Sequence, residues 1–587
     1  MGSPRILLTS VFGPYARDDE HGSRSINPME LYHNQVTRTQ GVFSLRMFHR
    51  SWGLMLIQAN LDAPTTLLDF PTLERFVEEL RGDRYDVVGI SAIYPNLEKV
   101  ATMCALIRRH LHRATIVVGG HVANVPDLER RVGADFAVCG DGVSWFRRFL
   151  GEDESAPIRH PVIRSGLGAR TMGVPLSSRP EKTAATLIPS VGCPLGCNFC
   201  STSAMFGGKG RFVSFLRTGD ELFGAMCELE RVTGVRSFFV MDENFLLLRP
   251  RALRLLERMR SADKAWSLYV FSSANALRRY EMAELVALGV SWVWLGLEGE
   301  DSGYSKLRET DTRALVAELH SHGIRVLGSS ILGLPAHTPE TIPAAIDHAV
   351  AHDTDFHQFM LYTPLPGTEL YAEQAGKGSL LSEAECPPAD SHGQLRFNFR
   401  HPHLRDGEET ELLLRAFERD FHANGPSVLR IARTLLAGWR RHRDHPEPRV
   451  RARVRRECGD LPTAWAAALW AGERWLREHP ALTRRLRDVR AGIEAEFGAI
   501  ARVTAPLLGR FVLARMRREQ RRLDRGWRYE PPTFYEVNAA EAASGRSTGR
   551  RCRWVHPGVP DAAAPLAASA PDRRGDRRYR PSDSSSS

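Results

Sequence analysis

The sequence of 587 residues has few cysteines and no long apolar run. Its nine cysteines are too few and too unevenly placed for the disulfide framework of a small secreted domain. No apolar run reaches the roughly 18 residues of a membrane-spanning helix. The first residues also lack the apolar stretch and cleavage site of a signal peptide. These features predict a cytoplasmic protein without a membrane span.

Lysine is absent from one long segment, where the positive charge comes from arginine alone. Residues 430–530 hold 25 arginines and 12 aspartates and glutamates, an excess of 13 positive charges, whereas the whole chain carries +10. The tryptophans of residues 463–475 recur at helical offsets, which indicates core packing. We expect an Arg-rich helical region with solvated arginines. Nucleic acid is not expected as a partner, because no RNA-binding signature accompanies the charge.

Three of the cysteines occupy one short loop with the spacing C-x3-C-x2-C: Cys193, Cys197 and Cys200. A structural zinc site needs four ligands, and the next cysteine is Cys227, far along the chain. Three thiolates on a 4Fe-4S cluster would leave one iron open to a substrate or cosubstrate, whereas ferredoxins use four cysteines. Three buried cysteines, or zinc with a distant fourth ligand, are the alternatives.

Residues 1–150 alternate between short apolar strands and helical segments. This order predicts an α/β fold with a doubly wound, Rossmann-like parallel sheet. Ligands of such sheets lie beyond the carboxyl ends of the strands. Small residues gather there, and small residues let a bulky ligand approach the backbone. The candidate ligand-binding residues are Ser91, Ala92, Gly119, Gly120, His121, Gly140, Asp141 and Gly142.

A second α/β series follows a Pro-, Gly- and Ser-rich segment, residues 151–183, which we interpret as a linker. Residues 184–385 contain six strand and helix pairs, which predict a partial (β/α)6 TIM barrel. Its expected strands cover residues 186–191, 237–241, 266–271, 292–297, 326–332 and 356–361. Polar residues again follow the strands. Residues 386–538 read as an α-helical C-terminal region, and residues 539–587 as a disordered tail.

The cysteine loop resembles that of the radical S-adenosylmethionine (SAM) superfamily, including Phe199 before the third cysteine. The resemblance implies a 4Fe-4S cluster on Cys193, Cys197 and Cys200, with SAM on the open iron. It also implies SAM contacts from the strand ends. Asp242 and Glu243 stand where the family has a Gly-Gly-Glu motif, so the amino-group ligand is open between them. The implied SAM-binding residues are Phe199, Asp242, Glu243, Ser272, Glu298, Ile331 and Gly333.

The first domain carries Val118-Gly-Gly-His121 and, at residues 133–142, the run GADFAVCGDG. Together with the barrel it resembles the B12-dependent radical SAM proteins, which implies that the eight candidate residues above bind cobalamin. Asp19-Glu-His21 partly matches the D-x-H-x-x-G motif whose histidine ligates cobalt in other cobalamin domains. It lacks the final glycine, and we interpret it as a chance match. A nucleotide-type fold without a corrin is the alternative.

The resemblance implies a cobalamin-dependent radical SAM C-methyltransferase acting on an unactivated carbon of a small-molecule or natural-product substrate. A 5′-deoxyadenosyl radical would abstract hydrogen, and methylcobalamin would supply the methyl group. An electron donor such as flavodoxin or ferredoxin would reduce the cluster. A cyclase or rearrangement enzyme with the same cofactors remains an alternative. Methylthiolation would need a second cluster on N-terminal cysteines, and Cys104 with Cys139 are too few for it. A non-catalytic corrin or cluster sensor that binds nucleic acid is the alternative of another class. No residue is assigned as catalytic.

Overall fold

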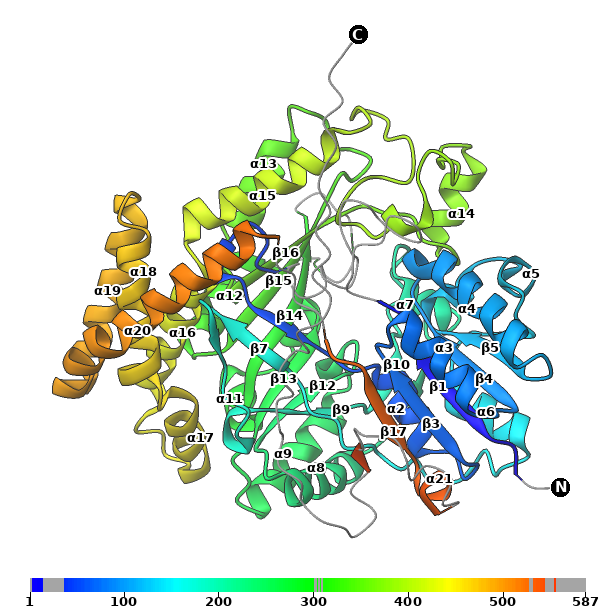
Figure 1. Ribbon diagram of the computed structural model, residues 1–587. Coiled ribbons are helices and arrows are strands. Elements are labelled where there is room, and N and C mark those ends of the chain that lie inside the picture. Colours follow the sequence, from blue (N-terminus) through cyan, green and yellow to red (C-terminus); the bar gives the residue numbers. More distant parts are fainter. Residues whose placement is uncertain are drawn as a thin grey trace.

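The computed structural model describes residues 3–13, 36–299, 304, 307, 310–526, 531–543 and 554–555. Figure 1 shows two α/β units side by side, the N-terminal unit in blue and the second unit in green. Yellow and orange helices cover the side of the second unit that faces away from the first. The Asp19-Glu-His21 motif and most of the predicted tail lie outside the described residues.

The N-terminal unit is a doubly wound sheet, as predicted. Five of its strands are parallel, in the order β3-β1-β4-β5-β6. All side chains of β1 and β3 are buried, because helices cover both faces of the sheet. The strands are β1 (Ile6–Ser10), β3 (Thr65–Asp69), β4 (Val87–Ser91), β5 (Thr115–Gly119) and β6 (Phe136–Val138). The helices are α2 (Trp52–Ala59), α3 (Leu73–Gly82), α4 (Leu97–His110), α5 (Leu128–Val132) and α6 (Gly142–Leu150).

The C-terminal end of the described chain completes this first sheet. Strand β17 (Phe534–Val537) pairs antiparallel with β3, and β18 (Trp554–Val555) lies beside β17. Helix α21 (Ala539–Ala543) follows β17. Glu541 of α21 is fully buried and accepts hydrogen bonds from Arg5. The sequence analysis assigned residues 534–538 to the helical region and 539–543 to a disordered tail. Both assignments were wrong, because the edge of β3 pairs with this segment.

The predicted linker is ordered. Strands β7 (Leu167–Thr171) and β8 (Val174–Pro175) form a three-stranded antiparallel sheet with β2 (Arg46–Phe48). A 3-10 turn, η4 (Pro180–Lys182), precedes the barrel. Arg170 of β7 forms a 2.6 Å ion pair with Glu519 of the helical region. The predicted linker therefore does more than connect two domains in sequence. It also contacts both the N-terminal unit and the C-terminal helices.

The second unit is a partial barrel of six parallel strands among the described residues, paired in chain order. The strands are β9 (Ala185–Leu187), β12 (Ser237–Val240), β13 (Ser267–Ser272), β14 (Val290–Glu298), β15 (Arg325–Leu332) and β16 (Phe356–Leu361). The intervening helices are α8 (Gly219–Thr233), α9 (Arg249–Ser261), α10 (Ala274–Leu277), α11 (Met282–Leu288), α12 (Thr312–Ser321) and α13 (Ile342–Val350). This architecture confirms the predicted (β/α)6 barrel.

The first predicted barrel strand is divided in two. Strand β9 stays in the barrel, whereas β10 (Ser190–Gly192) pairs antiparallel with β11 (Phe212–Ser214) in a separate hairpin. Pro189 lies between β9 and β10 and has no N–H to donate to a ladder. The break turns the chain out of the barrel just before the cysteine loop.

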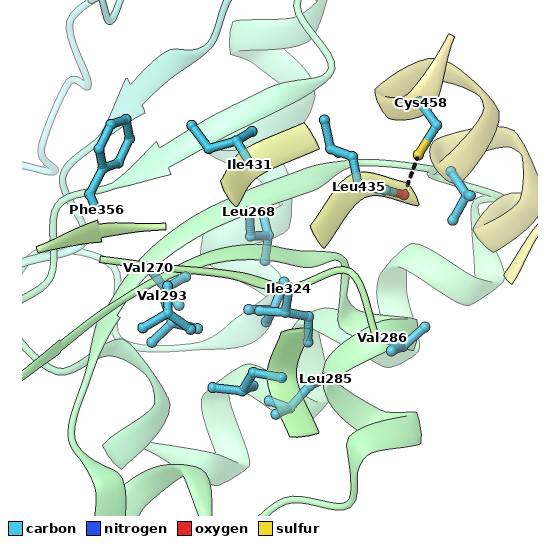
Figure 2. Packing of buried hydrophobic residues seen from close by; sticks show 14 of the residues in the cluster. Leu268, Val270, Leu285, Val286, Val293, Ile324, Phe356, Ile431, Leu435 and Cys458 are labelled. Carbon is cyan, nitrogen blue, oxygen red and sulfur yellow. Dashed lines mark hydrogen bonds between the residues drawn. The ribbon is translucent and has the colours of Figure 1, made fainter. Parts of the chain in front are cut away.

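The C-terminal helices share two hydrophobic clusters with the barrel. They are α14 (Glu369–Gly376), α15 (Glu408–Asn424), α16 (Ser427–His442), α17 (Pro448–Cys458), α18 (Ala466–Trp475), α19 (Pro480–Phe497) and α20 (Ala499–Asp524). Figure 2 shows Ile431 and Leu435 of α16 beside Leu268 of β13, within one cluster of buried residues. Within the described part of the chain, no helix is both long and apolar enough to cross a bilayer.

Candidate functional site

A cavity of about 300 Å³ lies between the two α/β units. One wall comes from the carboxyl ends of β4, β5 and β6, and from helix α2. The other comes from β10 and from helix α7 (Ser201–Met205), which follows the cysteine loop. The volume is at the low end of the roughly 300–1,000 Å³ typical of small-molecule sites. The cavity therefore lies where both units are expected to bind ligands.

Seven of the eight predicted cobalamin contacts line this cavity: Ser91, Gly119, Gly120, His121, Gly140, Asp141 and Gly142. The eighth, Ala92, lies just behind Gly120. Gly120 adopts φ +82°, and a Cβ there would lie 2.5 Å from the carbonyl oxygen of Ala92. Only glycine fits this position, and its bare backbone forms part of the cavity wall.

Asp141 has a structural role that the sequence did not reveal. Its side chain caps α6 by accepting hydrogen bonds from the backbone N–H groups of Val143 and Ser144, at 2.9 and 3.3 Å. It also accepts a 2.6 Å hydrogen bond from the Ser144 hydroxyl. Such a cap stabilises a helix start by about 1 kcal/mol. The carboxylate thus fixes the glycine turn beside it.

His121 links the two walls. Its Nε2 lies 3.0 Å from Oγ1 of Thr202, two residues after the last loop cysteine. Burial lowers the pKa of His121. A neutral imidazole has one donor and one acceptor nitrogen, and either can pair with a hydroxyl. Asn124 adds a second contact by donating a 3.2 Å hydrogen bond to the carbonyl oxygen of Ser201.

The three cysteines lie together between hairpin β10–β11 and helix α7. The Cys200 sulfur accepts a 3.5 Å hydrogen bond from the backbone N–H of Ser203, at the start of α7. Burial raises the pKa of Cys193 to about 12, and the nearby Cys200, Glu243 and Cys197 raise it further. Burial also raises the pKa of Cys200. A positively charged centre would therefore release protons from these thiols when it binds.

The two acidic residues after β12 are used differently. Asp242 is buried in an ion pair with Arg251 of α9 and accepts a 3.2 Å hydrogen bond from the N–H of Asn244. Glu243 lines the cavity beside the cysteine loop. Burial raises the pKa of Glu243 to about 7, and the neighbouring Asp242 carboxylate contributes to the same shift. The structure thus separates a structural acid from one that faces the cavity.

Ser272, at the end of β13, belongs to a small polar cluster. Its hydroxyl lies 3.5 Å from Oδ1 of Asn244, and Asn244 donates a 3.0 Å hydrogen bond to Ser273. Asn244 follows the Asp-Glu pair and was not among the predicted contacts. Its position directly after a barrel strand is the sequence signal that could have identified Asn244 as a site residue.

Glu298 ends β14 in a left-handed conformation, with φ +54°. A register shift between Gly296 and Glu298 interrupts the pairing of β14 with β15 at this point. Left-handed conformations cost a non-glycine residue about 1 kcal/mol or more and concentrate at functional sites. Burial is the main reason why the pKa of Tyr304 is raised. The neighbouring Tyr362 raises it further, and the buried Glu298 carboxylate adds a smaller effect in the same direction.

The remaining predicted SAM contacts share one apolar cluster. Phe199 and Ile331 both belong to it, and Phe199 packs edge-on against Tyr304 with 5.2 Å between ring centroids. Gly333 adopts φ +74°, and a Cβ there would lie 2.2 Å from the Phe397 ring. The sequence analysis assigned Phe397 to the helical region, yet it packs onto the barrel.

Several cavity residues carried no sequence signal. The apolar residues Trp52 and Ile57 come from helix α2, which was not predicted. Thr202, Met205 and Phe206 come from helix α7 and the residue that ends it, directly after the cysteines. Proximity to Cys200 could have identified the second group but not the first.

The two units match two known domain families. The B12 binding domain matches residues 38–150, and the Radical SAM superfamily matches residues 187–349. A methyltransferase of Pyrococcus horikoshii described as uncharacterized is 26% identical over 333 residues, 51% of this chain and 71% of that protein. Bacteriochlorophyllide d C-12(1)-methyltransferase of Chlorobaculum tepidum is 29% identical over 34% of this chain and 45% of that protein.

One solved structure has the same fold. It is the radical SAM methyltransferase TsrM of Kitasatospora setae, solved with cobalamin and a 4Fe-4S cluster bound. The TM-score is 0.50 at 18% identity, over 78% of this chain and 99% of that one. The chain therefore contains a B12-binding domain and a radical SAM domain, whose cofactors are cobalamin, SAM and a 4Fe-4S cluster, and the relatives named above are methyltransferases.

Proposed function

We propose that the chain is a cobalamin-dependent radical SAM C-methyltransferase for an unactivated carbon of a small-molecule or natural-product substrate. The observation that carries the proposal is the shared cavity. Its walls are the strand ends of the B12-binding unit and, in the radical SAM unit, strand β10 and helix α7 on either side of the cysteine loop. The His121–Thr202 contact holds these walls together. A cavity between two cofactor sites suits an enzyme in which both cofactors act on one substrate.

Cys193, Cys197 and Cys200 are the proposed ligands of the cluster. Glu243 is the proposed acceptor for the amino group of SAM, because Arg251 already pairs with Asp242. Ser272 and Glu298 would bind its ribose and carboxylate. Phe199, Ile331 and Gly333 would pack against its adenine. When bound, the cluster supplies an electron, SAM a carbon radical and cobalamin a methyl group.

The corrin is proposed to lie against the small residues of the first unit: Ser91, Ala92, Gly119, Gly120, His121, Gly140, Asp141 and Gly142. Most of them line the cavity, and the bare backbone of Gly120 allows close approach. The apolar side chains of Trp52, Ile57 and Phe206 surround this surface. They would exclude water from the reacting groups, which protects reactive species from side reactions.

An electron donor and a location complete the proposal. A small protein such as flavodoxin or ferredoxin would supply the electron, and the enzyme would work in the cytoplasm. A cyclase or rearrangement enzyme would use the same residues, so that second function stays open at this site. The methyltransferase relatives favour methyl transfer over it.

The test is anaerobic turnover with hydroxocobalamin, a reductant and methyl-labelled SAM. Extract fractions are then compared by mass spectrometry. Methyl transfer predicts 5′-deoxyadenosine together with a product heavier by about 14 daltons, one CH2, that carries the label. Formation of 5′-deoxyadenosine with a rearranged, unlabelled product would favour the cyclase instead.

A further inference from the structure

Helix α20 carries an apolar stripe on its outer face. Ile500, Val503, Leu507 and Phe511 follow one another at intervals of three and four residues, the spacing of one helix face. Together with Leu508 they are between 45% and 61% exposed. These five side chains, called the outer stripe below, account for most of the large exposed apolar residues among the described ones.

The inner face of the same helix is already packed. Ala501, Ala505 and Gly509 are buried, and α20 lies along α18 and α19. Figure 1 places these three helices at the edge of the molecule, away from the N-terminal unit. The outer stripe is therefore a second apolar face, and the fold of the chain does not need it.

Arginines flank the outer stripe on one side and at its C-terminal end. Helical periodicity places Arg510 along one side of it, and Arg518 and Arg521 on its continuation towards the C-terminal end of α20. All three are exposed, and none forms an ion pair within the described residues. By contrast, Arg515 reaches back to the carbonyl oxygen of Gly173, and the buried Glu519 pairs with Arg170. The charges on the inner side are thus satisfied, and those on the outer side remain available.

Charge decides between the possible occupants. A second copy related by twofold symmetry would bring the same arginines face to face, which is repulsive. An anionic surface would neutralise them while it accepts the apolar side chains. Helices that lie in the lipid interface show this pattern, with apolar side chains flanked by arginines whose charged ends reach the headgroups.

We propose that the outer stripe of α20 docks the enzyme onto a membrane surface rich in anionic lipids. Ile500, Val503, Leu507, Leu508 and Phe511 enter the headgroup boundary, and the flanking arginines contact lipid phosphates. The helix lies flat on the membrane, because its inner face stays attached to α18. Docking is reversible and weakens with salt, since exposed charges are screened beyond about 10 Å at 0.1 M salt.

The test is co-sedimentation of the full-length, anaerobically purified protein with lipid vesicles. One set contains phosphatidylcholine alone, and the other contains phosphatidylcholine with phosphatidylglycerol. We expect binding to the second set only, reduced at high salt. The double variant Leu507→Gln/Phe511→Gln should bind at least about tenfold more weakly, because apolar burial is lost while charge is kept. Arg510→Gln/Arg518→Gln should lose the preference for anionic lipid.

Two controls keep the result specific. Leu176→Gln removes another exposed leucine, 48% exposed and outside α20, and should bind like the wild type. Iron content and thermal unfolding should be unchanged in every variant, since these side chains point outward. Equal binding of the wild type and the double glutamine variant would overturn the proposal, as would failure to bind anionic vesicles. A dimer in light scattering that the same variant dissociates would overturn it in favour of a second copy.

Discussion

The Nε2 atom of His121 lies 3.0 Å from Oγ1 of Thr202, and this contact joins the B12-binding unit to the helix that follows the cysteine loop. His121 comes directly after the glycine turn of β5, and Thr202 is the second residue of α7. Any change that shifts one side of the cavity is therefore transmitted to the other.

Replacing Thr202 with valine should weaken this connection without altering side-chain volume. We expect the affinity for hydroxocobalamin to fall about three- to tenfold, because one partly buried hydrogen bond contributes about 1 kcal/mol. Iron content should stay at the wild-type level. Spectroscopic titration measures the affinity, and Thr102→Val is the control, since Thr102 bonds only within α4. Unchanged affinity would show that the contact does not shape the corrin site.

Replacing Gly120 with alanine should damage the same wall from within. The new Cβ would lie 2.5 Å from the Ala92 carbonyl oxygen, in a residue with φ +82°. We expect the free energy of unfolding to fall by about 1–3 kcal/mol, together with weaker cobalamin binding. The control is Gly133→Ala, because Gly133 has φ +75° and no neighbouring atom within 4 Å of its Cβ. Equal loss in both variants would indicate backbone strain alone.

The sequence predicted the elements that repeat a simple pattern. Strands such as β4 and β5 are continuous apolar runs that end in small residues, and the barrel repeats the same unit. The candidate site was largely predictable for the same reason, because both α/β units place ligands at the carboxyl ends of their strands. Glu298 and Gly333 were chosen from the family resemblance at such ends, and neither lines the cavity between the two units.

The errors come from contacts between distant parts of the chain. Strand β3 contains two threonines and an aspartate, yet all its side chains are buried, because it lies between β1 and β17 inside the sheet and helices cover the faces. Strand β17 has no local signal for pairing with a strand more than 460 residues earlier. The roles of Asp141 and Asp242 depend on Ser144 and Arg251, and the sequence did not show which acid would be left facing the cavity.

The cluster can be tested by removing one sulfur. Anaerobically reconstituted wild-type protein should hold about four irons and four sulfides. Cys197→Ala should lose the cluster and SAM cleavage, because two thiolates cannot hold a cubane. Cys227→Ala is the control, since Cys227 lies on α8, outside the loop. Iron analysis and 5′-deoxyadenosine formation provide the readouts, and a stoichiometric zinc atom in place of iron would contradict the assignment.

Asp355 should make stability depend on pH. Its carboxylate accepts 2.8 Å hydrogen bonds from the Val326 N–H and the Thr434 hydroxyl, and His320 lies 2.9 Å away. Burial alone would raise the pKa of Asp355, but His320 and these hydrogen bonds lower it below the usual range. The folded state therefore binds this proton less readily than the unfolded state, and the stabilisation is present above about pH 4.

At pH 7, Asp355→Asn should lower the free energy of unfolding by about 2–4 kcal/mol, because buried partners lose their acceptor. The difference from the wild type should shrink as the pH falls below about 4, where the wild-type carboxylate also becomes protonated. Urea unfolding at several pH values measures this difference in the free energy of unfolding. Asp347→Asn removes the exposed partner of Arg419 and should change stability by less than about 1 kcal/mol. A pH-independent difference would rule out the carboxylate charge as its cause.

The last prediction concerns the C-terminal segment that completes the first sheet. Glu541 is fully buried and pairs with Arg5, which also reaches Asp83 at 2.6 Å. Glu541→Gln should lower the free energy of unfolding by about 1–3 kcal/mol, less than a fully isolated buried charge would cost, because Asp83 still balances Arg5. The matched control is Glu383→Gln, which breaks the exposed pair with Arg131 at 2.7 Å and should cost less than about 1 kcal/mol. Hydrogen exchange should show faster exchange in β17 and β3 of the Glu541 variant, because α21 holds this edge of the sheet. Equal stability of the two variants would mean that the segment after β17 contributes nothing to the fold.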